Sequence, residues 1–395
     1  MPDAKTKVLI LGGGFGGVKA ALNLADNRRY SVTLMSDQDE FRYYPALYLA
    51  ATGGDTSASS IPLFEIFAGK RVKIIHDTAK TLNRDSKTIK GSSGKNYSYD
   101  LLVVALGMVT NYFGIKGLKQ YSYGLKSQAE ARELRDHLHK QLADKNTPDL
   151  NYVVIGGGAT GVELAGALPF YLRHIMTKHM LPPKKIHIDL VEAESRLMPR
   201  MPRAYSSAVQ KRLRRLGIRL HLNQKVEAES AGELTFSGHS VKSRSVIWTA
   251  GVACNPFLAA NKFNLNERGK VIVNHLLQAE DDICVIGDNA ATTYSGMAQT
   301  ALHDGLFVAE NLNRISGGHP PKPYKPRKPV YVTPAGPYWA AVQWGQLQLY
   351  GRLGWSTRQA ADLIGYHDLQ PWWPAYKNWV ASNTGDEYCA ICMRS

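Results

Sequence analysis

The sequence predicts an α/β protein with two parallel sheets and a small α+β region at its C-terminus. Two observations lead to this prediction. An apolar strand at residues 8–11 enters a glycine-rich loop, and the same arrangement recurs at residues 151–161. Short apolar runs of this kind are typical of buried parallel strands. A chain of 395 residues is too long for one hydrophobic core, so we expect two or three domains.

The first loop has the G-x-G-x-x-G spacing of a dinucleotide site, with Gly12, Gly14 and Gly17 in the three glycine positions. In such a loop the first glycine permits a tight turn, the second lets the backbone approach a pyrophosphate, and the third packs the helix on the strand. The helix that follows presents free N–H groups to the phosphates. The residues expected to bind the first nucleotide are Gly12, Gly14, Phe15, Gly16 and Gly17.

Two further strand ends should complete the first site. A carboxylate at the end of the second strand, residues 31–35, would accept hydrogen bonds from an adenosine ribose. Ser36 stands at that end, so Asp37 is a slightly displaced candidate, and both residues are assigned to the site. The buried strand at residues 101–104 is followed by Ala105 and Gly107, whose small size allows a cofactor to approach closely.

The second loop repeats the spacing at Gly156, Gly158 and Gly161, with Ala159 and Thr160 inside it. Its partner strand, residues 186–191, ends in Glu192. This separation exceeds the usual interval of about 20 residues, because a basic insertion at residues 173–185 lengthens it. A glutamate at this strand end pairs with two ribose hydroxyls and repels a 2′-phosphate, which favours NADH over NADPH. Arg196 lies nearby and would favour the phosphate.

A third apolar strand, at residues 283–286, ends in Gly287-Asp288 and returns the chain to the first sheet. Asp288 would accept hydrogen bonds from the polyol chain of a cofactor. The helix that begins near residue 298 points its positive end toward the same place. The prediction is two Rossmann-like dinucleotide-binding domains, the second inserted in the first. The first domain comprises residues 1–122 and 254–328, the second residues 123–253, and the C-terminal region residues 329–395.

The C-terminal region is distinguished by its aromatic residues. A linker at residues 316–329 leads to a hairpin predicted around Gly345. Six of the seven tryptophans lie after residue 335, and tryptophan concentrates at protein and membrane interfaces. The alternative is a small C-terminal core or a dimer contact. Cys389 and Cys392 have the spacing of a redox motif but stand at the terminus, and we expect them to be inert and no metal to be bound.

The net charge of +15 is compatible with nucleic acid, an anionic membrane surface, anionic substrates or a merely solvated surface. Four basic residues cluster on one predicted helix without interleaved aromatic residues: Lys211, Arg212, Arg214 and Arg215. This pattern indicates a solvated face rather than a stacking platform, so no nucleic-acid partner is expected. With only four cysteines, the composition favours a reducing compartment.

The order of these motifs resembles that of flavoproteins with two dinucleotide-binding domains, most closely the type II NADH:quinone oxidoreductases. The stretches that carry the resemblance are residues 12–17, 44–48, 51–53, 110–114, 126–127, 156–166, 248–252, 287–288 and 298–299. The resemblance implies FAD on the first loop, with its isoalloxazine near Thr52, Asp288, Ala298 and Gln299. It implies NADH on the second loop, with the nicotinamide beside Glu163. Further cofactor contacts are then expected at Ala79, Ala250, Gly251 and Gly287.

The resemblance also implies an activity and a location. Members of the family are peripheral proteins on the cytoplasmic side of the cell membrane, often dimeric, and reduce quinone without pumping protons. Quinone reduction consumes protons, so Glu163, Gln299 and His303 are the catalytic candidates, His303 because its ordinary pKa of about 6.5 suits proton transfer. The family usually has a second glutamine where this chain has His303, and leucine-rich helices where this chain has its tryptophan-rich tail.

Four alternatives compete with this interpretation. Disulfide reductases and sulfide:quinone oxidoreductases need cysteines beside the flavin, and residues 41–60 contain none. A reductase of a soluble electron carrier is the nearest enzyme alternative. An NADH-binding redox sensor or interaction flavoprotein is an alternative of a different class.

Overall fold

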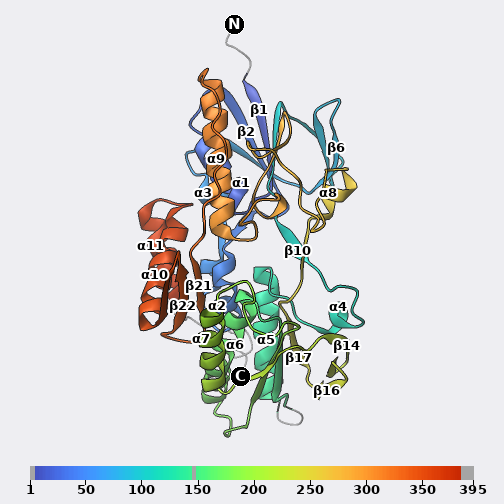
Figure 1. Ribbon diagram of the computed structural model, residues 1–395, viewed down its shortest axis with the longest axis vertical. Helices are drawn as coiled ribbons and strands as arrows, with labels where there is room; N and C mark the ends of the chain where they lie inside the picture. The colour runs from blue at the N-terminus through green and yellow to red at the C-terminus, as the bar shows by residue number, and fades with distance from the viewer. Residues whose placement is uncertain (1–4, 145–147, 384–395) are drawn as a thin grey trace.

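The computed structural model describes residues 5–144 and 148–383, so the predictions about Cys389 and Cys392 lie outside the described residues. Two α/β units follow one another along the long axis of the molecule (Figure 1). A third unit, formed by the C-terminal strands and helices, lies against one side near the level where the first two meet.

The first unit is built on a six-stranded sheet with the order β19-β20-β9-β1-β2-β5. Its strands are β1 (Thr6–Leu11), β2 (Tyr30–Ser36), β5 (Val72–His76), β9 (Leu101–Val104), β19 (Gln278–Glu280) and β20 (Ile283–Val285). β20 pairs in parallel with β9, which confirms that the chain returns to the first sheet after residue 280. The central strands are buried on both faces, which explains their continuous apolar sequences.

Helices α1 (Phe15–Leu24) and α9 (Ala298–Ser316) lie side by side on one face of this sheet (Figure 1). Glycine makes their close approach possible. A Cβ at Gly305 of α9 would overlap the carbonyl oxygen of Gly16 in α1 and come within 3.2 Å of the Ala20 nitrogen. The helix at the first nucleotide loop is therefore held by a helix that begins almost 300 residues later.

The second unit has a four-stranded parallel sheet with the order β13-β12-β11-β17. Its principal elements are β11 (Asn151–Ile155), β12 (His187–Val191), β13 (Arg219–His221), β17 (Ser245–Trp248), α5 (Gln128–Ala143), α6 (Ala159–Lys178) and α7 (Arg203–Arg215). The first six residues of the insertion predicted at residues 173–185 are helical, because α6 continues to Lys178. A small antiparallel sheet, β14 (Val226–Ser230), β15 (Glu233–Phe236) and β16 (His239–Lys242), completes the unit.

The chain passes between the two units through an antiparallel pair, β10 (Met108–Thr110) and β18 (Val252–Cys254). The apolar stretch at residues 41–54 forms β3 (Glu40–Arg42), a 3₁₀ turn η1 (Tyr44–Ala46) and α2 (Leu47–Ala51). α2 packs on α5 and α6, so this segment of the first unit is part of the core of the second.

The C-terminal unit has more structure than the sequence predicted. The expected hairpin is present as β22 (Ala340–Trp344) and β23 (Leu347–Gly351). A third strand, β21 (Tyr331–Pro334), and two helices, α10 (Arg352–His367) and α11 (Trp372–Asn383), were not predicted. Among the residues that the structure describes, no helix is both long and apolar enough to cross a bilayer.

We predict that Gly305→Val destabilises the protein by about 1–3 kcal/mol, because the added side chain must push α9 away from α1. The midpoint of chemical denaturation measures the effect. The matched control is Gly317→Ala, at the C-terminus of the same helix, where φ is −86° and a Cβ fits. Equal stability of the two variants would contradict the account of α1–α9 packing.

Candidate active site

The first glycine loop has the geometry that phosphate binding requires. Gly12 has φ +111°, and a Cβ there would overlap the carbonyl oxygen of Ala105. A Cβ at Gly17 would overlap the carbonyl of Gly12. Gly14 is the N-cap of α1 and has no side-chain cap, and a Cβ there would meet nothing within 4 Å. Free N–H groups at a helix start beside open space fit the phosphates of a dinucleotide.

The end of β2 brings Ser36 to this loop, whereas Asp37 is exposed. The Ser36 hydroxyl accepts a hydrogen bond from the Gln38 amide at 3.1 Å. It also lies beside Gly13, whose Cβ would come 2.6 Å from Ser36 Oγ. A hydroxyl, rather than the expected carboxylate, therefore stands closest to the loop, with the Asp37 carboxylate one residue away.

The end of β20 meets the end of β9 through residues that the sequence analysis did not single out. The Asn289 side chain accepts from the Gly107 amide at 3.0 Å and donates to the Gly107 carbonyl at 2.8 Å. The buried Asp304 of α9 accepts from the Gly287 amide at 3.0 Å, and burial raises its pKa to about 6. Asp288, between Gly287 and Asn289 in the chain, is half-buried. The sequence carries no local signal for these contacts, because the burial and the partners of Asn289 and Asp304 follow from the fold.

The first turns of α9 hold the linker that follows this helix. Gln299 and the Val330 backbone exchange two hydrogen bonds, each of 3.0 Å. His303 donates from Nε2 to the Lys325 carbonyl at 3.0 Å. The structure therefore gives Gln299 and His303 backbone partners on the path toward the C-terminal unit.

The structure also gives the partners of the predicted residues Thr52 and Ala79 and of Lys126, which lies in a stretch that carries the resemblance. Thr52, which follows α2, donates to the Tyr48 carbonyl at 2.8 Å. Ala79, at the start of β6 (Ala79–Asn83), packs in the core with Leu11. The Lys126 ammonium lies 5.5 Å from the centre of the Tyr44 ring, and burial lowers its pKa while Asp288 opposes that shift.

The second glycine loop repeats the geometry of the first. Gly156 has φ +112°, and a Cβ there would come within 2.8 Å of Ala250 Cα. Gly161 packs on the carbonyl of Gly156, and Gly158 is an uncapped N-cap that faces open space, as Gly14 does. Ala159, Thr160 and Gly251 lie next to these residues in the loop and after β17.

Glu192 is fixed beside this loop by two backbone amides. Its Oε2 accepts from the Gly157 amide at 2.5 Å and its Oε1 from the Glu194 amide at 2.8 Å. Arg196, which would have favoured a 2′-phosphate, donates instead to the carbonyls of Pro199 and Met201 and to the Ser206 hydroxyl. The Glu192 carboxylate is therefore held beside the loop, and the Arg196 guanidinium is bonded to other groups. Both features favour NADH over NADPH.

Glu163, in the second turn of α6, is buried at the point where all three units meet. Its Oε1 lies 3.3 Å from Nη1 of Arg358, which comes from α10. Arg358 also donates to Asp362 at 2.6 Å. Burial raises the pKa of Glu163 to about 7, although Arg358 opposes the shift. Sequence reasoning missed Arg358 and Asp362, because their only signal is an i,i+4 pair of opposite charges.

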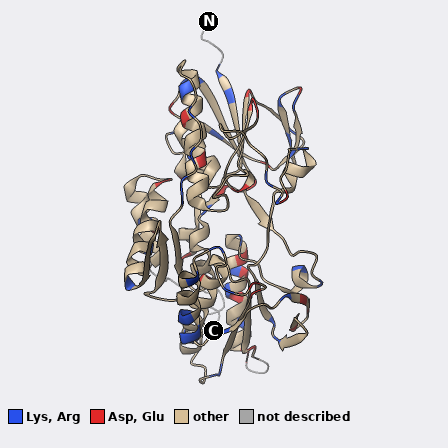
Figure 2. Ribbon diagram, viewed as in Figure 1, with Lys and Arg blue, Asp and Glu red and all other residues tan. Residues whose placement is uncertain are grey.

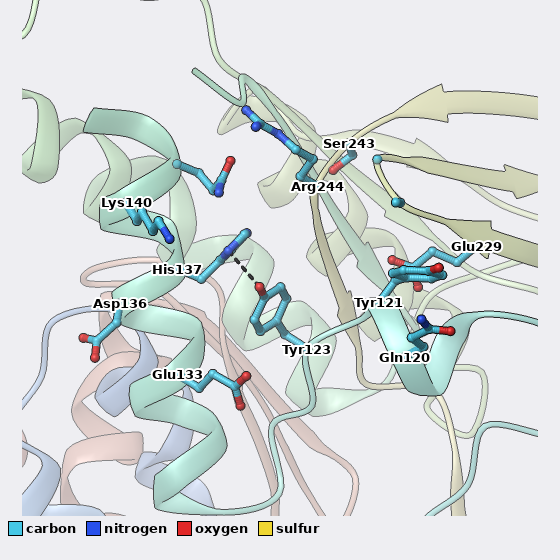
Figure 3. Close-up of a pocket in the computed structure, with 13 residues that line it drawn as sticks. Gln120, Tyr121, Tyr123, Glu133, Asp136, His137, Lys140, Glu229, Ser243 and Arg244 are labelled. Atoms are coloured by element: carbon cyan, nitrogen blue, oxygen red, sulfur yellow. Dashed lines mark hydrogen bonds between the residues drawn. The ribbon is translucent and has the colours of Figure 1, made fainter. Parts of the chain in front are cut away.

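Two of the cavities formed by the described residues adjoin the second unit. One, of 550 Å³, lies at the amino end of β17 and is lined by Glu229 and Arg244, among other residues (Figure 3). In its wall, Tyr123 hydrogen-bonds to His137. No residue of either glycine loop lines it, so it is separate from the nucleotide sites. The other, of 630 Å³, runs along α6 and reaches Thr52 and Gly53. Within residues 5–144 and 148–383, no three His, Cys, Asp or Glu side chains gather as a metal site would require.

Comparison with known proteins gives results that agree with this geometry. A family model for pyridine nucleotide-disulphide oxidoreductases matches residues 6–305. The type II NADH:quinone oxidoreductase of Staphylococcus aureus is 26% identical over 342 residues, which cover 80% of this chain and 84% of that protein.

Two solved structures share the fold over nearly the whole chain. NDH2 from Plasmodium falciparum, in complex with NADH, has a TM-score of 0.86 at 16% identity and covers 96% of this chain and 97% of its own. The sulfide:quinone oxidoreductase of Aquifex aeolicus has a TM-score of 0.78 at 21% identity and covers 98% and 93%. These matches confirm the predicted α/β architecture.

The family match runs from β1 into α9 and so includes both glycine loops, Glu163 and the Gly287–Asn289 turn. The chain therefore belongs to the pyridine nucleotide-disulphide oxidoreductase family and is an oxidoreductase that uses FAD and NADH.

Proposed function

We propose that this protein is an NADH:quinone oxidoreductase that passes two electrons from NADH through FAD to a membrane quinone without pumping protons. The observation that carries the proposal is the pair of complete nucleotide loops, together with the buried Glu163 near the start of α6. Similarity to the type II enzyme of Staphylococcus aureus over 80% of the chain supports it. The absence of cysteine from residues 41–60 argues against a disulfide reductase.

We assign FAD to the loop at Gly12 and NADH to the loop at Gly156. We assign the polyol chain of FAD to Asp288, on the turn after β20, and the ribose of NADH to Glu192. The remaining contacts assigned to FAD are Gly14, Phe15, Gly16, Gly17, Ser36, Asp37, Thr52, Ala79, Ala105, Gly107, Gly287 and Ala298. Those assigned to NADH are Gly158, Ala159, Thr160, Gly161, Ala250 and Gly251.

FAD, when bound, supplies the acceptor of the hydride from NADH and the donor of two electrons to the quinone. The protein must hold the two nucleotides in place and handle a proton, because the overall reaction converts NADH, one H⁺ and quinone to NAD⁺ and quinol. We assign the proton to Glu163, whose pKa of about 7 suits exchange near neutrality. Gln299 and His303, at the start of α9, remain the candidates on the quinone side.

The C-terminal unit is the surface we propose to contact an anionic membrane on the cytoplasmic side. Its helices and hairpin expose large apolar side chains: Trp344, Leu347, Leu353, Ile364, Trp372, Trp373 and Tyr376. Lys and Arg gather on the neighbouring helix α7 (Figure 2). Each suitably placed Lys or Arg contributes about 1 kcal/mol of attraction to anionic lipid. The alternative role for the same apolar surface is a homodimer contact.

Substitution in the two loops tests the cofactor assignment. Gly12→Ala should lose FAD during purification, because a Cβ there overlaps the Ala105 carbonyl. Gly156→Ala should retain FAD but weaken NADH binding about tenfold or more, because a Cβ there crowds Ala250. Flavin absorbance and an NADH titration measure the two effects. Loss of FAD from Gly156→Ala with unchanged NADH binding would reverse the assignment.

A panel of acceptors tests the activity. We expect NADH oxidation to be fastest with a quinone and slower with a ferredoxin-like carrier or with oxygen. His303→Ala should lower quinone turnover about 100-fold and leave turnover with an artificial acceptor unchanged. Faster reduction of the soluble carrier would instead identify a carrier reductase, and unchanged quinone turnover in His303→Ala would remove this residue from the mechanism.

Co-sedimentation with vesicles tests the membrane surface. The double variant Trp372→Ala/Trp373→Ala should bind anionic vesicles several-fold less than the native protein, because both side chains are exposed on α11. Binding should also fall as salt rises. The matched control is Phe64→Ala, which removes an exposed aromatic residue from the first unit. Equal losses in both variants, or no binding at low salt, would contradict the proposal.

A further inference from the structure

Arg358 makes hydrogen bonds to residues of all three units. Its Nη1 donates to Glu163 of the second unit at 3.3 Å. Its Nη2 donates to the Pro45 carbonyl of the first unit at 2.9 Å, and its Nε donates to Asp362 on its own helix at 2.6 Å. The planar guanidinium has its donors in a fixed fork, so these three bonds fix the position of the group.

The cluster is buried and its charges do not cancel. Arg358 is 6% exposed and Glu163 8% exposed. One guanidinium faces two carboxyl groups, and an uncompensated charge in a buried site is costly. One of the two carboxyl groups therefore tends to hold a proton near neutral pH. Asp362 makes the shorter contact with Arg358, so Glu163 is the carboxyl that titrates.

Each charged neighbour shifts the pKa of Glu163 in a known direction, in addition to the increase that burial causes. The positive charge of Arg358 favours the ionised form and lowers the pKa of Glu163, whereas Asp362 raises it. Tyr48 from α2 and Tyr205 from α7 also face the cluster, and burial raises the pKa of both, so both stay neutral. Because the groups interact, the titration of Glu163 depends on the charges of Arg358 and Asp362.

The buried charge of Arg358 is not needed to hold the C-terminal unit against the other two units. Lys19 of α1 already holds the end of α10, with its Nζ 3.0 Å from both the Asp368 carbonyl and carboxylate. The Tyr366 ring of α10 is buried on Tyr43. An apolar side chain would join the buried surfaces at least as well as a buried ion pair does.

We propose that Arg358 is a positioning residue for Glu163, so that the C-terminal unit sets the orientation of this carboxyl and its readiness to exchange a proton. Asp362 holds Arg358 in place and opposes its electrostatic effect. The inference rests on the proposed function, in which Glu163 passes the proton that quinone reduction consumes. It assigns a part of the reaction to a helix that lies outside both nucleotide-binding domains.

The test measures the ionisation of Glu163 directly, in the FAD-loaded protein without NADH. Infrared difference spectra recorded against pH give the titration midpoint, and Glu163→Gln identifies its band. Arg358→Met should raise the midpoint by about one pH unit or more, because a favourable cation is lost. Asp362→Asn should lower it, because an unfavourable anion is lost. Lys19→Met, the matched control for attachment of α10, should leave it unchanged.

The pH profile of kcat for NADH:quinone turnover gives the second measurement. The limb that Glu163→Gln removes should shift upward in Arg358→Met and downward in Asp362→Asn. Arg358→Lys keeps the charge and should lie closer to the native protein than Arg358→Met in both measurements. This variant also replaces Arg358→Met if the latter does not fold.

Midpoints that stay fixed, or that move the same way in Arg358→Met and Asp362→Asn, would overturn the role of Arg358. So would a shift of the same size in Lys19→Met, because that result would indicate a general effect of loosening α10. The infrared midpoints do not depend on the acceptor. A protein that fails to reduce quinone would thus contradict the proposed function, and the Arg358 inference would still be decided by the midpoints.

Discussion

Close approach of the backbone at two glycine loops is the constraint on which the rest of this structure depends. At Gly12 and Gly156 the chain adopts positive φ and passes so near a neighbouring strand end that no Cβ fits. Both turns leave a helix N-terminus without a side-chain cap and facing open space. Each of the two sheets carries one such turn at the end of a parallel strand. The neighbouring strand ends supply the groups that surround a nucleotide.

Long-range contacts then bring the two sites into one molecule. α9 packs on α1 through Gly305, so the first loop is supported by a segment that the chain reaches only after completing the second unit. α2 belongs to the first unit in sequence but packs in the core of the second. These shared elements fix the position of one nucleotide site relative to the other, which electron transfer between two bound cofactors requires.

The C-terminal unit combines one property that its sequence indicated with one that it did not. Its outer surface is apolar and aromatic, with Trp372 and Trp373 exposed on α11. The same unit also buries Arg358 and Asp362 of α10 where it meets the other two units. A surface suited to a membrane and a buried cation beside Glu163 thus lie on adjoining helices, which links the acceptor side of the proposed reaction to its proton-exchanging residue.

Local sequence was sufficient to predict a feature where only one type of residue can form it. The glycine spacings, the apolar strands that precede them and the Glu192 strand end could be identified because only these residues permit those turns and contacts. Local sequence was insufficient at Asn289, Asp304 and Arg358, because a polar residue acquires its partner only when distant segments meet. It also missed β21 and the two C-terminal helices, whose stability comes from packing against other units rather than from periodicity. The sequence by itself determined the architecture and the two nucleotide loops, and the tertiary structure alone decided which charge lies against Glu163.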